Sequence, residues 1–253
     1  MENTSGDLQL QFDGRVAAIT GGAQGMGREH AILLGKRGAR IVVNDLDGEG
    51  AESTAEAIRV AGGEAVVVHG SIAQKEVAQT VVEVAIATWG RIDIVINNAG
   101  VEIKKPFLDF TDEDFSRMMA VHVWGSWMLT HLAWPHMRKQ KYGRVLMVLS
   151  ATIAGMPGNA AYTVAKGALF GLNRTLAVEG QADGITVNMF GPFANTAMAR
   201  QMLDDESLQW MGQKFPASAT SAAVAWLVHE ECKINGESIT SYCYGQLSDS
   251  RIC

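Results

Sequence analysis

The sequence predicts an α/β protein with a seven-stranded parallel sheet and helices on both faces. Short apolar runs alternate with longer helical patterns along the chain, which is typical of strands joined by right-handed helical crossovers. No internal repeat, low-complexity block or Pro/Gly-rich linker divides the sequence. We therefore interpret residues 1–253 as one doubly wound domain, with a tail at 1–14.

The strands are predicted from short apolar runs, and the helices from apolar residues at helical spacing. Gly38 suits the end of the first helix, because glycine is common just past a helix. Thr111 suits the start of a long central helix, since a threonine cap and three acids follow one another there. Pro135 is expected to kink or end that helix near residue 137. The predicted strands are 15–20, 40–45, 65–69, 92–96, 144–149, 185–190 and 238–244, and the helices after the first are 48–61, 75–89, 111–137, 159–179 and 222–228.

The turn between the first strand and the first helix carries the first chemical signal. Gly21, Gly25 and Gly27 stand where a strand must turn sharply into a helix, and glycine permits close approach to the backbone. A helix that begins there directs unpaired N–H groups and its positive dipole end at any group above the turn. The turn therefore suits a pyrophosphate, although tight turns also use glycine for steric reasons alone.

The second predicted strand ends in an acid, Asp45, which lies 18 positions after Gly27. This spacing is close to that of a carboxylate that binds a ribose 2′-hydroxyl in a Rossmann-type dinucleotide site. Asp45 would repel a 2′-phosphate, no arginine directly follows it, and Gln24 lies in the glycine turn. We therefore expect NAD rather than NADP as the cofactor.

Composition restricts the class of protein. The chain has 47% hydrophobic and 19% charged residues and a net charge of −6, which fits a globular protein and argues against nucleic-acid and anionic-membrane partners. The three cysteines, Cys232, Cys243 and Cys253, have no metal-binding spacing, and we expect no bound metal. Reduced cysteines, a polar N-terminus and the absence of a long apolar run predict a cytoplasmic protein.

Ser150 follows the fifth predicted strand, and Tyr162 and Lys166 follow on the next helix. Their i, i+4 spacing places the tyrosine and the lysine on one helical face. A nearby ammonium lowers the pKa of a phenol, so that the phenol can act as a base near neutral pH. A serine hydroxyl can orient the substrate oxygen and stabilise charge on it.

Over essentially its whole length the chain resembles the short-chain dehydrogenase/reductase family. The matching motifs are the glycine turn that ends at Gly27, Asn97-Asn-Ala-Gly100, Ser150 and the Tyr162-to-Lys166 pentapeptide. The resemblance implies an NAD-dependent interconversion of a secondary alcohol and a ketone. It assigns the acid/base role to Tyr162, the pKa-lowering role to Lys166 and polarisation of the carbonyl to Ser150. It predicts cofactor contacts from Gly21, Gln24, Gly25, Met26, Gly27, Asp45, Asn98, Ala99, Gly100, Tyr162, Lys166 and Pro192.

The chain departs from the family pattern at three places. His122 stands where the family has an asparagine of a water-linked proton path, so it is either catalytic or a core histidine. Pro192 is followed by Phe193, whereas the family has Pro-Gly in this loop on the nicotinamide side. Ser150 lies only 12 residues before Tyr162, which makes Thr152 a minor rival.

Within the family, the chain is similar to the dehydrogenase part of the peroxisomal multifunctional enzymes of β-oxidation. This resemblance favours a (3R)-hydroxyacyl-CoA or a related thioester as substrate, handled by a stand-alone dehydrogenase because no hydratase segment precedes Cys253. Apolar side chains in a lid at about 196–217 and four cations, Lys104, Lys105, Arg200 and Lys214, would receive it. A bulky apolar alcohol such as a steroid or cyclic ketone is the alternative substrate, and an NAD(H)-binding redox sensor is the non-enzyme alternative. The family also implies a homodimer or homotetramer paired through residues 112–137 and 159–179.

Overall fold

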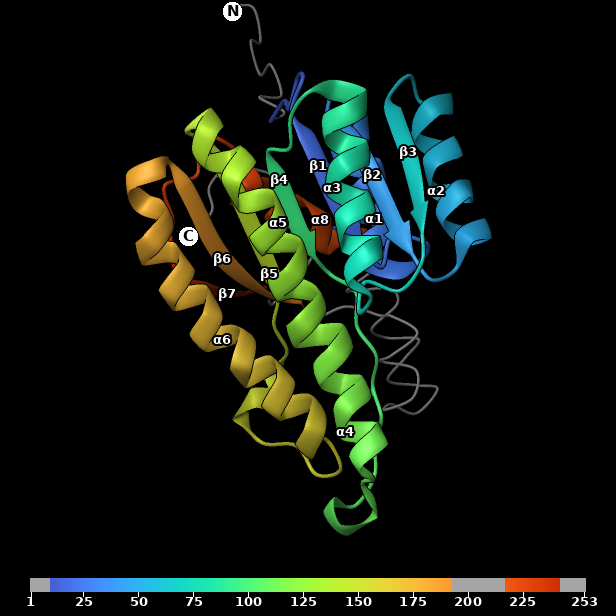
Figure 1. Ribbon diagram of the computed structural model, residues 1–253, viewed down its shortest axis with the longest axis vertical. Helices are drawn as coiled ribbons and strands as arrows, with labels where there is room; N and C mark the ends of the chain where they lie inside the picture. Colours follow the sequence, from blue (N-terminus) through green and yellow to red (C-terminus); the bar gives the residue numbers. More distant parts are fainter. Residues whose placement is uncertain (1–9, 193–216, 242–253) are drawn as a thin grey trace, which may run out of the picture.

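The computed structural model describes residues 10–192 and 217–241, and these form one seven-stranded sheet with helices on both faces (Figure 1). All six neighbouring strand pairs are parallel, in the order β3-β2-β1-β4-β5-β6-β7. The predicted fold class is therefore confirmed. The strands are β1 (Val16–Thr20), β2 (Arg40–Asp45), β3 (Glu64–His69), β4 (Ile94–Asn97), β5 (Gly143–Val148), β6 (Ile185–Pro192) and β7 (Ser238–Ser241).

The helices lie in two layers. One layer packs on one face of the sheet through the core that includes Val81, Leu129 and Leu169, and the opposite layer packs through Leu34, Ile58 and Val224. The first layer comprises α3 (Lys75–Trp89), α5 (Gly125–Gln140) and α6 (Ala160–Gly180), and the second α1 (Gly25–Lys36), α2 (Gly48–Val60) and α8 (Ala217–Val228). Short 3-10 helices are η1 (Phe107–Asp109), η3 (Ala151–Ala154) and η4 (Gln181–Asp183).

The central strands are apolar on both faces because helices cover both sides of the sheet. Every residue of β1 is buried, and in β4 the same is true from Ile94 to Asn97. In the order of strands, β1 and β4 are neighbours although β2 and β3 separate them in sequence. The direction of winding therefore reverses between β1 and β4, and ligands of open α/β sheets bind at the carboxyl ends of such a pair.

The predicted ends of the helices are largely confirmed. Gly38 follows α1 with a φ of 87°, a left-handed conformation that glycine adopts without a steric penalty. Thr111 caps α4 (Asp112–Met118) in a reciprocal capping box with Asp114. Pro135 does not end the central helix, which continues to Gln140, because the buried side chains on either side of it keep α5 packed on the sheet.

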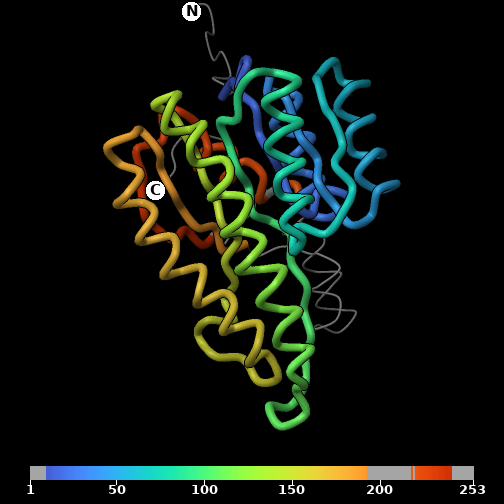
Figure 2. The backbone as a smooth tube through the Cα atoms, viewed as in Figure 1, coloured from blue at the N-terminus to red at the C-terminus, as the bar shows by residue number. Residues whose placement is uncertain are grey.

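The central helix is instead interrupted earlier, by one π-helical segment, η2 (Met119–Trp124). At its end the N–H of Gly125 donates to the carbonyl of Ala120, five residues back rather than four. Figures 1 and 2 show that α4 and the first turns of α6 extend beyond the carboxyl edge of the sheet, with residues 101–110 running beside α4. In this extension Met118, Ala161 and Tyr162 form a small apolar cluster with Val101 and Ile103.

Two of the sequence predictions concern parts of the chain that the structure describes only partly. Within the predicted tail, Phe12 is buried and its ring packs edge-on against His229, with 5.1 Å between the ring centroids. The predicted lid lies almost entirely outside the described residues, as do Arg200 and Lys214.

Candidate active site

The glycine turn joins β1 to α1 in a space that larger residues would block. A Cβ on Gly27 would lie 2.1 Å from the carbonyl oxygen of Gly21, so only glycine permits this approach of helix to strand. Gly21 has a φ of 67°, and a Cβ there would lie 2.9 Å from the Cα of Ala99. Gly25 also has a positive φ, 57°, but no described atom lies within 4 Å of where its Cβ would be. The turn is therefore tight on the protein side and open above Gly25.

The N-terminus of α1 faces this open space, and no side chain of the first turn neutralises the positive end of the helix dipole. Gln24 occupies the cap position without a side-chain bond to the helix, and no acid lies in the first turn. The backbone from Gly25 through Met26 to Gly27 therefore offers N–H donors and the positive dipole end to an anion. These features fit the pyrophosphate of a dinucleotide.

Asp45 lies beside the turn, at the end of β2. One carboxylate oxygen accepts from the N–H of Ala23 at 2.9 Å, and the other accepts from the N–H of Asp47 at 3.0 Å. These bonds fix the carboxylate between the turn and the start of α2. Each oxygen keeps lone-pair capacity for a further donor, such as a ribose hydroxyl.

The turn after β4 is tied to the glycine turn. The side-chain amide of Asn98 donates to the carbonyls of Thr20 and Gly21 at 2.9 and 3.1 Å, and the N–H of Ala99 donates to the Thr20 hydroxyl at 3.0 Å. Asn98 and Ala99 therefore hold the ends of β1 and β4 together at the reversal of the sheet. Gly100 is required by His122, since a Cβ at Gly100 would lie 2.6 Å from the imidazole Cε1.

Tyr162, Lys166 and Ser150 meet at the carboxyl end of β5. Lys166 is buried, and its ammonium donates to the carbonyl of Val148 at 2.7 Å and lies 5.4 Å from the centre of the Tyr162 ring. Ser150 caps η3, where its oxygen accepts from the N–H of Thr152 at 3.3 Å. A side-chain hydrogen bond also joins Ser150 to Tyr162. The structure thus brings the three residues together.

Burial disfavours the charged forms of both the Tyr162 phenol and the Lys166 amine. Desolvation raises the pKa of the Tyr162 phenol to about 12, while the hydrogen bond from Ser150 acts in the opposite direction. Desolvation lowers the pKa of the Lys166 ammonium to about 7. A phenolate at this position therefore requires a cation beside it, which the ring of an oxidised nicotinamide and a charged Lys166 would supply.

His122 lies within this assembly, inside the π-helical segment. Its ring is buried and packs edge-on against Tyr162, with 5.2 Å between centroids and an interplanar angle of 87°. Nε2 lies 2.7 Å from the carbonyl oxygen of Val101 and 3.1 Å from its amide nitrogen. We assign the proton to Nε2, as donor in the shorter contact, and this tautomer leaves Nδ1 as an acceptor. Nδ1 is buried and has no hydrogen-bond partner among residues 10–192 and 217–241, and desolvation lowers the pKa of the imidazole to about 3. His122 is therefore a neutral group beside the phenol with one free acceptor.

Two polar residues near Tyr162, Glu102 and Asn159, were not predicted as parts of the site. A third, Thr152, was predicted only as a rival of Ser150. Both carboxylate oxygens of Glu102, both polar atoms of the Asn159 amide and the Thr152 hydroxyl oxygen are buried, and none has a hydrogen-bond partner in the part of the chain that the structure describes. Glu102 follows directly after the β4 turn, so the rule that sites gather at strand ends could have identified it. Asn159 is the N-cap of α6 and lies three residues before Tyr162. Pro192, at the end of β6, pairs with Ser241 and is half-buried.

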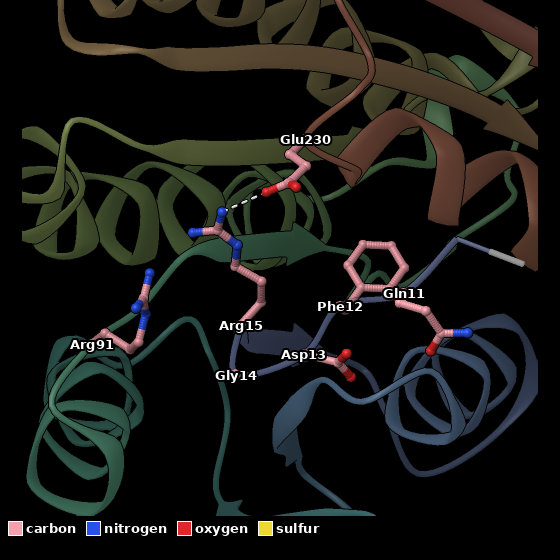
Figure 3. Close-up of a pocket in the computed structure, with 7 residues that line it drawn as sticks. All are labelled: Gln11, Phe12, Asp13, Gly14, Arg15, Arg91 and Glu230. Carbon is pink, nitrogen blue, oxygen red and sulfur yellow. Dashed lines mark hydrogen bonds and ion pairs between the residues drawn. The ribbon is translucent and has the colours of Figure 1, made fainter.

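A separate cavity of about 460 Å³ lies at the opposite end of β1 (Figure 3). Its cations are already paired: Arg15 bonds Asp93 and Glu230, and Arg91 holds both oxygens of the fully buried Asp93 at 2.7 Å. β1 has five residues, and a rise of about 3.3 Å per residue puts this cavity roughly 16 Å from the glycine turn. The cavity is therefore distinct from the dinucleotide site.

Among the described residues, no group of three or more His, Cys, Asp or Glu side chains could hold a metal ion. Within the same residues, no helix is both long and apolar enough to span a bilayer.

A doubly wound sheet with a glycine-rich phosphate turn and a Ser-Tyr-Lys cluster at its carboxyl edge defines an oxidoreductase that uses a nicotinamide dinucleotide on alcohol groups. The chain belongs to the short-chain dehydrogenase family, whose model matches residues 15–207.

The relatives of the chain include peroxisomal multifunctional enzymes and a dehydrogenase subunit whose name contains a CoA thioester. The chain is 39% identical over 237 residues to peroxisomal multifunctional enzyme type 2 of Mus musculus, covering 90% of this chain but only 31% of the mouse protein. It is 34% identical over 183 residues to the (2S)-[(R)-hydroxy(phenyl)methyl]succinyl-CoA dehydrogenase subunit BbsD of Thauera aromatica, covering 72% of this chain and 74% of that one. A solved structure of a putative short-chain alcohol dehydrogenase from Sinorhizobium meliloti superimposes with a TM-score of 0.84 at 27% identity, covering 91% and 95% of the two chains.

Proposed function

We propose that the protein is an NAD-dependent dehydrogenase that oxidises a (3R)-hydroxyacyl-CoA, or a related thioester, to the 3-ketoacyl form. The observation that carries the proposal is the meeting of Ser150, Tyr162 and Lys166 at the carboxyl edge of the sheet, on the same edge as the glycine turn. A cofactor-binding redox sensor would have no chemical need for this cluster. The cluster therefore favours turnover over sensing.

When bound, NAD supplies the hydride acceptor. Tyr162 would take the proton of the substrate hydroxyl as the hydride leaves, and the Ser150 hydroxyl would orient the substrate oxygen. Lys166, anchored on the carbonyl of Val148, would stabilise the phenolate electrostatically and has donors to spare for a ribose hydroxyl. His122 presents Nδ1 as an acceptor beside the phenol, where it would hold a water of a proton path to Lys166.

The preference for NAD over NADP rests on Asp45. Its carboxylate is fixed beside the glycine turn by the N–H groups of Ala23 and Asp47. A 2′-phosphate would meet this negative charge directly, whereas a free 2′-hydroxyl would donate to it.

The acyl-CoA part of the proposal draws on the similarity to the peroxisomal multifunctional enzymes, on the succinyl-CoA dehydrogenase subunit among the relatives and on two lysines of the loop after β4. Lys104 is exposed, and a Cβ on Gly158 would lie 3.0 Å from its side-chain Cγ, which places Lys104 beside the loop that follows β5. Lys105 is engaged differently, because its ammonium forms an ion pair with Asp114 at 2.5 Å. Lys104 is thus the better candidate for a CoA phosphate, and Lys105 would have to leave Asp114.

A panel of alcohols tests the proposal. We expect the highest kcat/KM for a (3R)-hydroxyacyl-CoA, below it the N-acetylcysteamine thioester of the same acid, and lower values for cyclic and steroid alcohols. Replacement of Lys104 and Lys105 by alanine should raise KM for the CoA ester but not for the N-acetylcysteamine thioester, which has no phosphates. If the CoA ester has no advantage, the substrate is instead a bulky apolar alcohol.

We also propose that the protein is a homo-oligomer paired through α4, α5 and α6. Figure 1 shows α5 and α6 side by side on one face of the molecule. Large apolar side chains are exposed on this face, among them Trp124, Trp127, Val164 and Phe170. Their burial against a second copy would remove apolar surface from water, and a twofold axis would pair the same helices from both copies.

A further inference from the structure

We propose that Glu102 determines specificity: its carboxylate excludes substrates that carry a negative charge two carbons from the reacting carbon and so reserves the site for neutral esters and thioesters. The proposal rests on the proposed dehydrogenase function and adds the means by which the enzyme distinguishes a thioester from the free acid.

The position of Glu102 follows from its neighbours in the chain. Val101 holds the imidazole of His122 through its carbonyl at 2.7 Å, and Val101 and Ile103 pack against the cluster that contains Tyr162. Glu102 lies between them, and its charge is near enough to the phenol to raise the pKa of Tyr162. Glu102 therefore belongs to the segment that packs against Tyr162, and its buried carboxylate acts electrostatically on the phenol.

Glu102 has no partner that would neutralise it within the described part of the chain. Both of its oxygens are buried without a hydrogen bond to any described residue, although the residue as a whole is half-buried. Lys104 is the cation that acts on it, but the Lys104 side chain is exposed and forms no recorded bond with it among the described residues. Burial without a partner raises the pKa of the Glu102 carboxyl.

An unpaired carboxylate with little access to water interacts strongly with any charge brought close to it, because little solvent screens the interaction. The carboxylate of a 3-hydroxy acid would lie two carbons from the carbon that reacts at Tyr162. Its thioester carries no charge there and escapes the repulsion. Repulsion between like charges is a recognised means of specificity. Here it would exclude the free 3-hydroxy acid, which is the product of thioester hydrolysis.

The experiment compares matched substrates on Glu102→Gln, which keeps the shape of the side chain and removes the charge. The substrates are (3R)-3-hydroxybutyrate, its methyl ester and its CoA thioester, each with NAD at mildly alkaline pH. We expect the variant to raise kcat/KM for the free acid by about tenfold or more while it changes kcat/KM for the methyl ester by less than about threefold. Glu113→Gln removes an exposed acid of α4 and should change neither value.

Two further measurements separate this role from others. Thermal unfolding should show an unchanged or raised Tm for Glu102→Gln, because a buried unpaired charge is removed. The apparent pKa of the catalytic phenol in the pH profile of kcat/KM should fall, because Glu102 raises the pKa of Tyr162. If the free acid remains as poor a substrate for Glu102→Gln as for the wild type, the charge-exclusion role is wrong. The acid and methyl-ester pair gives this result even if the CoA thioester proves not to be preferred, so the two proposals can fail separately.

Discussion

The ammonium of Lys166 donates a 2.7 Å hydrogen bond to the main-chain carbonyl of Val148, the last residue of β5. The bond fixes a buried lysine at the edge of the sheet, one helical turn from Tyr162. Desolvation brings the pKa of this ammonium down to about 7, so its charge near neutral pH depends on what else binds there. A bound ribose or phenolate would favour the charged form, which links occupation of the dinucleotide site to activation of the base.

Tyr162→Phe should reduce kcat by at least about a thousandfold, because the variant loses the group that accepts the proton. NADH affinity, measured by fluorescence titration, should change by less than about threefold because the ring and its packing remain. Lys166→Ala should reduce both kcat and NADH affinity. Substantial turnover by Tyr162→Phe would remove Tyr162 from the mechanism.

His122→Asn should retain much of the activity, since an asparagine can also hold a water beside the phenol. His122→Leu should lower kcat by about tenfold or more with little change in NADH affinity, because it removes the free acceptor Nδ1. Steady-state kinetics and the Tm of both variants distinguish a catalytic from a structural role of His122. A lower Tm for His122→Leu with unchanged kcat in the folded fraction would make His122 a structural core residue.

Asp45→Asn should reduce the ratio of kcat/KM for NAD to that for NADP by about tenfold or more. Asparagine keeps an acceptor for the N–H of Ala23 but removes the charge that would repel a 2′-phosphate. Asp47→Asn, at the adjacent cap of α2, is the matched control and should preserve the preference. An unchanged ratio for Asp45→Asn would show that another group selects the cofactor.

Stability should fall as the pH drops below 6.5, because two histidines are buried in the neutral form. Desolvation lowers the pKa values of both His30 and His122 from 6.5 to about 3, so the unfolded state binds protons that the folded state does not. Each histidine should then remove about 1.4 kcal/mol from the free energy of unfolding per pH unit below 6.5. Above that pH both histidines are neutral in both states and contribute no slope.

Denaturant unfolding at two mildly acidic pH values measures this slope. His30→Asn should flatten the slope, since Asn has no proton to bind and can still reach the Ser221 hydroxyl that His30 contacts at 2.8 Å. The exposed His131 supplies the control variant, His131→Asn. A slope that His30→Asn leaves unchanged would contradict burial of a neutral imidazole at that position.

Trp127→Glu should shift the protein to a smaller species in light scattering, because it places a charge within the proposed contact of α5 and α6. Val60→Glu, on the exposed face of α2 on the other side of the sheet, should leave the molar mass unchanged. A wild-type protein that is monomeric at high concentration would contradict the proposed pairing.

Much of the fold was predictable because the strands of a parallel sheet are buried on both faces and therefore appear in the sequence as apolar runs. The seven strands, the Thr111 cap and the glycine after α1 all follow from local patterns. The π-helical segment was not predictable, because one extra residue in a turn leaves almost the same apolar spacing as a continuous α-helix. Of the two effects predicted for Pro135, the end of the helix near residue 137 is wrong, since tertiary packing outweighs the loss of one backbone bond.

The residues of the site that belong to sequence motifs were predictable. Ser150, Tyr162 and Lys166 lie together as expected, but the anchor of Lys166 is a main-chain carbonyl that any residue at Val148 would supply. Likewise, the unpartnered Glu102 and Asn159 become notable only when burial and bonding are known. Sequence motifs indicate candidate reactive side chains. Only the three-dimensional structure shows which buried polar groups lack a hydrogen-bond partner among the described residues.

Isotope transfer tests the central claim most directly. (3R)-3-hydroxybutyryl-CoA carrying deuterium at C3 is incubated with NAD and the enzyme, and the NADH formed is analysed by mass spectrometry. The account predicts that deuterium appears in the nicotinamide ring of the product and that Tyr162→Phe yields essentially none. Absence of NADH, or NADH without deuterium, would contradict direct hydride transfer from this thioester.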